Sequence, residues 1–437
     1  MTINLRTSLN TGLNSGLRQS ISGGVNGLGF FRAASLDLQF ASKKTLNDRV
    51  SNSNLITFTR ASSGTYVDGN GIIQSATTNT PRFDHDPATG ESLGLLIEEA
   101  RTNELLYSQE FDNNWWLKAN SVITANAATS PAGDTTAEQL TPNAVNNTFS
   151  VYKRISFTSG NTYTQSIFAK ANTYSVIGLE EHTNSGGAKV TSFDLSNGTV
   201  GVTNAAHTAS IEDFGNGWYR CSITYSCTET ADDFVAVRIL ETINTGSASW
   251  TADGTSNLYL YGFQLEQGSF PTSYIPTSGS TVTRAADVAE ITGTNFSSFY
   301  NQSEGTVFVE AKASGASAVV GFDDGTTAER WRVGYAGSNN SSIVVVDGGV
   351  VQTNINTSSN STPYNQFHKL AGAIAANNLS FAHNGTLSSD SSVSVPVVNA
   401  LSLGTSIDVS GHINGHIKRL AYFPTRLPDA TLQNITS

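Results

Sequence analysis

The hydrophobic residues of this chain alternate with polar residues over many short stretches, and each stretch ends in a polar turn. In residues 34–41, ASLDLQFA, the side chains of Leu36, Leu38 and Phe40 fall on one face of an extended chain. Because successive side chains of a β-strand point to opposite faces, a period of two residues predicts strands rather than helices. No apolar run approaches the roughly 18 residues that a membrane helix needs. We therefore expect an all-β fold and no membrane partner.

Residues 35–106 contain two signals for β-hairpins. In GTYVDGNGIIQS, residues 64–75, two apolar stretches flank an Asp-Gly-Asn-Gly turn, which is a strong hairpin sequence. In RFDHDPATGESLGLLIEE, residues 82–99, a Pro-Ala-Thr-Gly turn separates two further strands. Asp86 stands at the first position of this turn, where its carboxylate can cap turn amides, and Gly90 supplies a positive φ.

Asp84, His85 and Asp86 follow one another in the second hairpin and raise the question of a metal site. Metal ligands must converge on one point. Neighbouring side chains in a strand diverge, with Phe83 and His85 on one face and the two aspartates on the other. We interpret the cluster as turn chemistry and predict no metal ligands there.

Residues 1–34 carry a hydrophobic side chain at every fourth position, separated by Gly, Ser and Asn. A helix could hold this stripe, but each of its glycines would cost about 1 kcal/mol relative to alanine. Because every spacing is even, an extended chain would also place the whole stripe on one edge. We predict an extended attachment arm that lies against another subunit, with a disordered tail as the alternative. The stripe consists of Leu5, Leu9, Leu13, Leu17, Ile21 and Val25.

The remainder of the chain predicts two β-sandwiches, over residues 107–285 and 286–437. Short strands recur at the spacing that sandwiches show, separated by Gly, Asn and Ser turns. The first domain has candidate strands at 149–157, 162–171, 174–182, 190–196, 217–227, 234–242 and 257–268. The second has them at 305–313, 317–325, 329–337, 342–349, 367–375, 379–387, 399–407 and from 416 onwards, where Pro428 and Asp429 indicate the start of a final helix.

Composition narrows the function further. Charged residues make up 14% of the chain and the net charge is −11, which argues against nucleic acid or an anionic membrane as a partner. The first residues contain no apolar segment of a secretory signal. Cys221 and Cys227 lie about 20 Å apart in an extended strand, too far for a disulfide bond. We expect two buried free thiols in a protein that folds in a reducing cytosol.

Residues 57–116 resemble a module that recurs in virion proteins of tailed phages and in prophage fibres. The resemblance rests on the TRASSGTYVD strand, the NTPRFDHDPATG turn and the GLLIEEARTNELLYS segment, which are present in this order. It implies a non-enzymatic head or tail fibre, spike or capsid decoration protein of the virion, assembled in the host cytoplasm. Its N-terminal region would attach it to other virion proteins, and the resemblance implies a homotrimer.

The two predicted sandwiches resemble other families. Residues 107–285 are similar to the jelly rolls of carbohydrate-binding modules, and residues 286–437 to concanavalin A-like lectins or laminin-G domains. The first resemblance implies a structural Ca²⁺, for which Glu110, Asp112 and Asp253 are candidate ligands. Their spacing alone does not support the site, and we predict no other cofactor.

The sequence leaves open whether the protein binds sugar. Tryptophan rings can stack on pyranoses and are therefore candidate binding residues. Trp115, Trp116 and Trp331 are the candidates, although each ring is also explained by core packing. A host-surface polysaccharide is the expected partner of such a site. No glucanase-type strand with paired carboxylates occurs after residue 286, and the sequence contains no His-Glu-x-x-His motif. We therefore predict no enzyme, with a polysaccharide depolymerase or a dedicated carbohydrate-binding protein as the alternatives.

Overall fold

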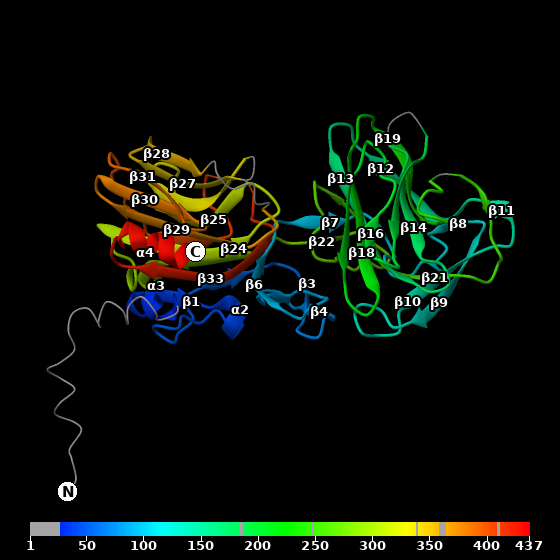
Figure 1. The fold of residues 1–437 in the computed structure, drawn as a ribbon, viewed down its shortest axis with the longest axis horizontal. Coiled ribbons are helices and arrows are strands. Elements are labelled where there is room, and N and C mark those ends of the chain that lie inside the picture. The colour runs from blue at the N-terminus through cyan, green and yellow to red at the C-terminus, as the bar shows by residue number, and fades with distance from the viewer. Residues whose placement is uncertain (1–26, 184–186, 247, 338–339, 358–363, 409–410) are drawn as a thin grey trace, which may run out of the picture.

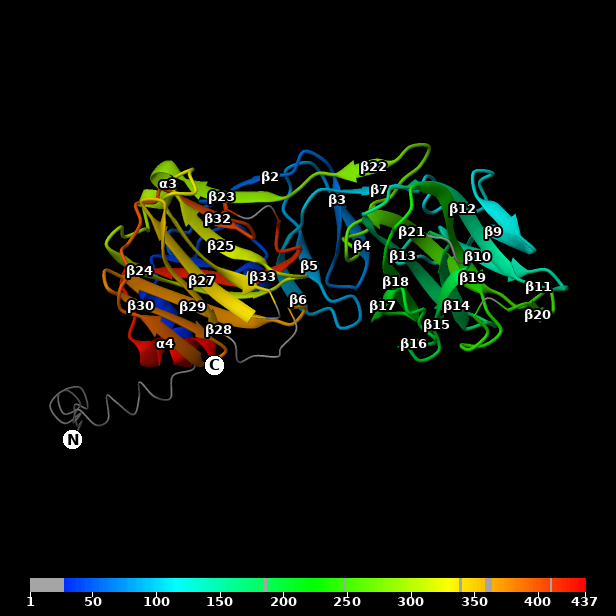
Figure 2. The same cartoon turned by 90° about the horizontal axis from the view of Figure 1, so that it is seen from above.

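The computed structural model describes residues 27–183, 187–246, 248–337, 340–357, 364–408 and 411–437. These residues form two β-sandwiches that lie side by side, which Figures 1 and 2 show from two directions. The predicted all-β fold class is confirmed. None of the helices among the described residues is long and apolar enough to cross a membrane.

The C-terminal sandwich is built from two large sheets whose strand pairings are antiparallel. In order, the first sheet contains β31 (Thr386–Asp390), β30 (Asn378–His383), β29 (His368–Ala375), β24 (Glu304–Lys312), β33 (Gly415–Phe423), β6 (Ser92–Ile97) and β5 (Phe83–His85), and β1 (Leu36–Leu38) also pairs with β33. The second sheet contains β2 (Thr57–Thr59), β23 (Val288–Thr292), β32 (Ala400–Leu403), β25 (Ser317–Asp323), β26 (Arg330–Ala336), β27 (Asn340–Asp347) and β28 (Val350–Thr357).

Short helices cover this sandwich. α4 (Asp429–Thr436) begins where the Pro-Asp pair predicts it, and its Leu432 and Ile435 pack on the outer face of the first sheet. Phe31 of the 3₁₀ helix η1 (Gly27–Ala33) packs beside them, with its ring 5.1 Å from that of Phe308. Two further short helices are α2 (Phe40–Lys43) and α3 (Gly293–Ser297).

The second sandwich lies between residues 104 and 281 of the chain. Its sheets contain, in order, β17 (Thr208–Asp213), β18 (Trp218–Ser226), β13 (Thr162–Ala171), β21 (Leu258–Gln267), β10 (Ala137–Pro142) and β9 (Ser121–Ala128), and β16 (Thr199–Val200), β15 (Lys189–Asp194), β14 (Val176–Glu181), β19 (Ala231–Ile239), β12 (Phe149–Phe157) and β8 (Leu117–Ala119). A small ribbon joins β11 (Asn146–Asn147) to β20 (Trp250–Thr251). Cys221 and Cys227 are buried free thiols, as predicted.

The chain enters and leaves the second sandwich side by side. β7 (Arg101–Asn103) on the way in pairs with β22 (Val282–Arg284) on the way out. Strands from residues 36–97 belong to both sheets of the C-terminal sandwich, and the predicted hairpin β3 (Gly64–Val67) with β4 (Ile73–Ala76) forms a separate ribbon. The second sandwich is thus inserted between strands of the C-terminal one. We call it the inserted sandwich; the sequence-based domain boundaries stay a prediction.

The second predicted hairpin, β5–β6, forms as expected, and its turn gives a first test. The carboxylate of Asp86 accepts hydrogen bonds from the amides of Ala88 and Thr89 at 3.0 and 2.8 Å, and Gly90 has a φ of 72°. Asp86→Ala is expected to destabilise the fold by about 1 kcal/mol, because both turn amides lose their acceptor. Urea unfolding measures this effect, with Ala at the exposed Glu241 as the control. Equal midpoints for the two variants would contradict it.

Candidate functional site

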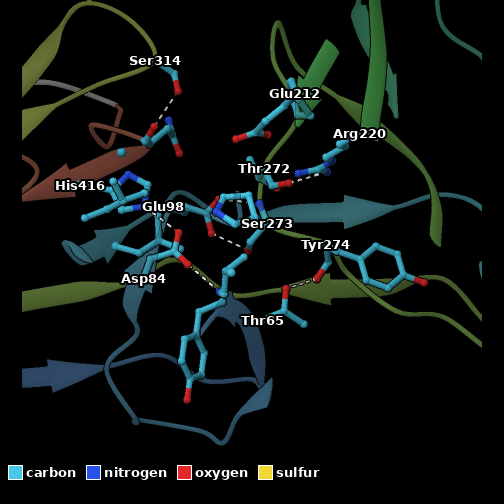
Figure 3. A pocket seen from close by; sticks show the side chains of 18 of the residues that line it. Thr65, Asp84, Glu98, Glu212, Arg220, Thr272, Ser273, Tyr274, Ser314 and His416 are labelled. Atoms are coloured by element: carbon cyan, nitrogen blue, oxygen red, sulfur yellow. Dashed lines mark hydrogen bonds and ion pairs between the residues drawn. The ribbon is translucent and has the colours of Figure 1, made fainter. Parts of the chain in front are cut away.

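A cavity of ≈ 330 Å³ lies where the two sandwiches meet. Its lining comes from three parts of the chain: the hairpins of residues 65–98, residues 168–220 and 270–274 of the inserted sandwich, and residues 312–314, 365 and 414–416 of the C-terminal sandwich. Figure 3 shows polar side chains from all three parts around it. The size falls within the roughly 300–1,000 Å³ of typical ligand pockets.

A cluster of buried charged side chains borders the cavity, and Glu98 of this cluster is one of the lining residues. Glu98 Oε2 lies 2.7 Å from Arg82 Nη1 and 3.3 Å from Arg284 Nη1. Asp287 forms ion pairs with both Arg82 and Arg60, the latter at 3.1 Å. All five side chains are almost fully excluded from solvent. We call these residues the arginine cluster.

The arginine cluster joins segments of residues 57–116 that are far apart in the sequence. Arg60 belongs to the TRAS segment, Arg82 precedes the FDHD turn and Glu98 lies in LLIEE, so three parts of this motif meet at one point. Burial opposes the ionisation of Glu98, but Arg284 and Arg82 hold its pKa well below the usual range. Ser273 adds hydrogen bonds to both carboxylate oxygens at 2.7 Å.

The wall formed by the C-terminal sandwich carries Asp84 and His416. The carboxylate of Asp84 accepts from the amide of Val67 at 2.6 Å and pairs with Nε2 of His416 at 2.7 Å. Burial lowers the pKa of His416, and the hydrogen bond to Asp84 offsets only part of this effect. His85, on the same hairpin, contacts the carbonyl of Val67 through Nδ1 at 2.9 Å. Asp84 is therefore occupied by hydrogen bonds and Glu98 by ion pairs.

The opposite wall belongs to the inserted sandwich and carries Arg220. Its Nη2 donates to Ser166 Oγ at 3.0 Å and to the carbonyl of Thr272 at 2.8 Å. Its guanidinium lies over the ring of Phe168, 5.3 Å from the centroid. Glu212 stands beside it at the solvent-exposed rim (Figure 3). Burial lowers the pKa of Arg220, while nearby carboxylates counteract this shift.

The tryptophans predicted to bind sugar lie away from this cavity. Trp331 is 0% exposed and stacks on Phe322 at 4.1 Å in the C-terminal core. Trp116 is 1% exposed and donates through Nε1 to the carbonyl of Tyr107. Trp115 is half-buried, with the ammonium of Lys153 4.6 Å from its ring centroid. Only Trp115 keeps part of its surface accessible, so Trp116 and Trp331 do not carry the prediction of sugar binding.

The candidate calcium ligands are not brought together as a set. Asp253 caps its own turn, accepting from the amides of Thr255 and Ser256. The amide of Asp112 donates to Glu138, and Glu110 is exposed. Among the described residues, no group of three or more His, Cys, Asp or Glu side chains could hold a metal ion.

The hydrophobic stripe of the predicted arm, Leu5 to Val25, lies outside the described residues. The sequence analysis also missed the main groups of the cavity. Asp84 and His416 are 332 residues apart and Arg220 lies in a strand that reads as sandwich core. The one available signal was the FDHD cluster, which we interpreted as turn chemistry alone.

Comparisons with known proteins show limited similarity. No protein-family profile and no curated protein sequence matches the chain. Among solved structures, domain 4 of an extracellular arabinanase from Geobacillus stearothermophilus, in complex with arabinotriose, is 11% identical, with 39% of this chain and 84% of that chain covered and a TM-score of 0.29. Mouse laminin α1 domains LG4–5 are 10% identical over 65% and 92%, with a TM-score of 0.24. Trypanosoma rangeli sialidase is 10% identical over 69% and 60%, with a TM-score of 0.27. Similarity of this extent assigns no function to the chain.

Proposed function

We propose that this chain is a non-enzymatic structural protein of a phage virion, either a fibre, a spike or a capsid decoration. The observation that supports it most is the convergence of the phage-type motif on the arginine cluster. In this proposal, the side chains of the motif stabilise the contact between the two sandwiches. The chain then presents two sandwiches outward as one body for contact with host-surface glycans.

The position of the described N-terminal residues fits attachment of the protein to the virion through its N-terminal region. Phe31 and η1 lie against the C-terminal sandwich, and in Figures 1 and 2 this end of the chain is on the body away from the inserted sandwich. A virion contact made by the residues before η1 would leave the inserted sandwich and the cavity accessible.

Assembly state tests this proposal. We expect the full chain and a chain lacking residues 1–26 to be homotrimers, because the β-sandwiches would supply the subunit contacts and the arm would serve docking. Sedimentation velocity with light scattering measures both masses. Keeping η1 preserves the contact of Phe31 with Phe308, so loss of the trimer could not be attributed to a damaged core. Monomers in both samples would contradict the fibre form of the proposal.

The alternative of a depolymerase has less support from the cavity. A glycosidase needs two carboxylates free to act on the scissile bond. Of the three carboxylates that line the cavity, Asp84 is hydrogen-bonded to His416 and Glu98 is paired with two arginines, which leaves only Glu212 among the described lining residues. Release of reducing ends from a host polysaccharide by the purified chain would overturn the non-enzymatic proposal.

A further inference from the structure

Three residues that line the cavity each carry one buried polar atom without a hydrogen-bond partner among the described residues. These atoms are Nε2 of His85, Nε of Arg220 and Nδ1 of His416. The three residues are only 4%, 9% and 9% exposed. Because a buried polar group without a partner costs about 1–3 kcal/mol, three of them around one cavity indicate that something else satisfies them.

The two imidazoles offer hydrogen-bond acceptors. Nδ1 of His85 faces the carbonyl of Val67, which can only accept, so Nδ1 carries a proton and, in the neutral ring, Nε2 presents a lone pair. Nε2 of His416 donates to the carboxylate of Asp84. Since burial lowers the pKa of His416, its ring is neutral near pH 7 and Nδ1 also presents a lone pair. Both atoms suit the hydroxyl groups of a ligand.

Arg220 offers a buried positive charge. No salt bridge within 4.0 Å joins its guanidinium to a carboxylate in the described part of the chain, but Glu212 is its cross-strand neighbour on β17, and Glu266 and Glu212 act electrostatically on its pKa. A guanidinium binds carboxylates well. Lys312 lines the cavity from the other sandwich, at the end of β24. An anion in the cavity would therefore contact both the inserted sandwich and the C-terminal sandwich.

We propose that this cavity binds an acidic saccharide. Its carboxylate would lie between Arg220 and Lys312, and its hydroxyls would donate to His85 and His416. The rings of Phe168, Phe214 and Phe270 also line the cavity and suit the apolar C–H faces of a sugar. The inference deepens the proposed function, since it names the class of glycan that a virion protein would contact.

Titration of the full chain with glucuronic, galacturonic and N-acetylneuraminic acids tests the proposal, with glucose and galactose as neutral probes. We expect at least one acidic sugar to bind with a dissociation constant in the millimolar range or below, and neutral sugars to bind more weakly. Saturation-transfer NMR and calorimetry both report this. Absence of binding by all three acids, or equal binding of the neutral sugars, would overturn the proposal.

Lys312→Gln is the decisive variant, because Lys312 is only half-buried, whereas removal of the buried Arg220 risks the fold. We expect about a tenfold loss of affinity for the acidic sugar. Lys418→Gln is the matched control: both lysines lie near the ring of Phe367, but Lys418 pairs with Glu91 and does not line the cavity. Equal affinities for the two variants would refute the site. A trimer that binds no acidic sugar would leave the structural role intact, which separates the two proposals.

Discussion

Glu98→Gln is expected to destabilise the chain by about 3–5 kcal/mol, the usual effect of breaking a buried ion pair by removing one partner. The substitution leaves three buried arginines facing the single remaining carboxylate of Asp287. It also weakens the acceptors for the amide and hydroxyl of Ser273 at the rim of the inserted sandwich. Urea unfolding followed by tryptophan fluorescence measures the loss. We expect the contact between the two sandwiches to weaken first.

Glu99→Gln is the matched control for this prediction. Glu99 is the next residue, and its ion pair with Arg101 at 2.6 Å is partly open to solvent. Glu99 is 31% exposed and Arg101 7% exposed, so this variant should lose less stability than one that breaks the fully buried cluster. Similar losses in both variants would show that the arginine cluster does not tie the sandwiches together.

The pH dependence of the same variant follows from the direction of the Glu98 shift. Its pKa in the folded chain lies below the usual value, so its stabilising contribution is complete above the ordinary glutamate pKa. The contribution is lost as the pH falls from there towards the lower pKa of the folded chain. The stability difference between wild type and Glu98→Gln should therefore narrow under acid conditions.

Local chemistry made the strands and turns of this fold predictable. Alternation in residues 34–41 indicated β1, although the strand ends at Leu38 and Phe40 begins α2 instead. The Asp86 turn and the Pro-Asp start of α4 follow from the properties of single residues. The pairing of β6, the second strand of the hairpin, with β33 could not be predicted in this way. It joins residues more than 300 positions apart, and nothing local specifies which sheet edge a hairpin completes.

The cavity was harder to predict from the sequence than the strand pairing. Alternation places Asp84 opposite His85 on a regular strand, but the register shifts between these two residues where β5 pairs with β6. Asp84 meets His416 only because β33 lies next to β6. Arg220 sits in a strand whose neighbours are core residues, and its hydrogen-bond acceptors come from Ser166 of β13 and from the loop at Thr272. A polar residue inside such a strand is the one feature that could have indicated it.

The second large change in stability is expected at Glu138 in the inserted sandwich. Its side chain is 3% exposed, and Oε2 accepts from the amide of Asp112 at 3.0 Å. Burial, together with the neighbouring carboxylate of Asp112, raises the pKa of Glu138 to about 8. The folded chain therefore holds this proton more tightly than the unfolded chain does.

Glu138→Gln is expected to stabilise the chain at pH 9 by about 2–4 kcal/mol relative to the wild type, since each pKa unit corresponds to about 1.4 kcal/mol. The glutamine amide can donate to Asp112 as the protonated acid does, without a charge to bury. In the wild type, the stability linked to this group is complete below the ordinary glutamate pKa of 4.5 and is lost as the pH rises through about 8. The two proteins should thus unfold at similar temperatures near pH 5 and diverge towards pH 9. Glu110→Gln, at an exposed position two residues before Asp112, is the control and should follow the wild type at both pH values. A Glu138→Gln variant that is less stable than the wild type at pH 9 would show that the amide of Asp112 and the nearby ammonium of Lys118 stabilise the ionised carboxylate more than burial opposes it.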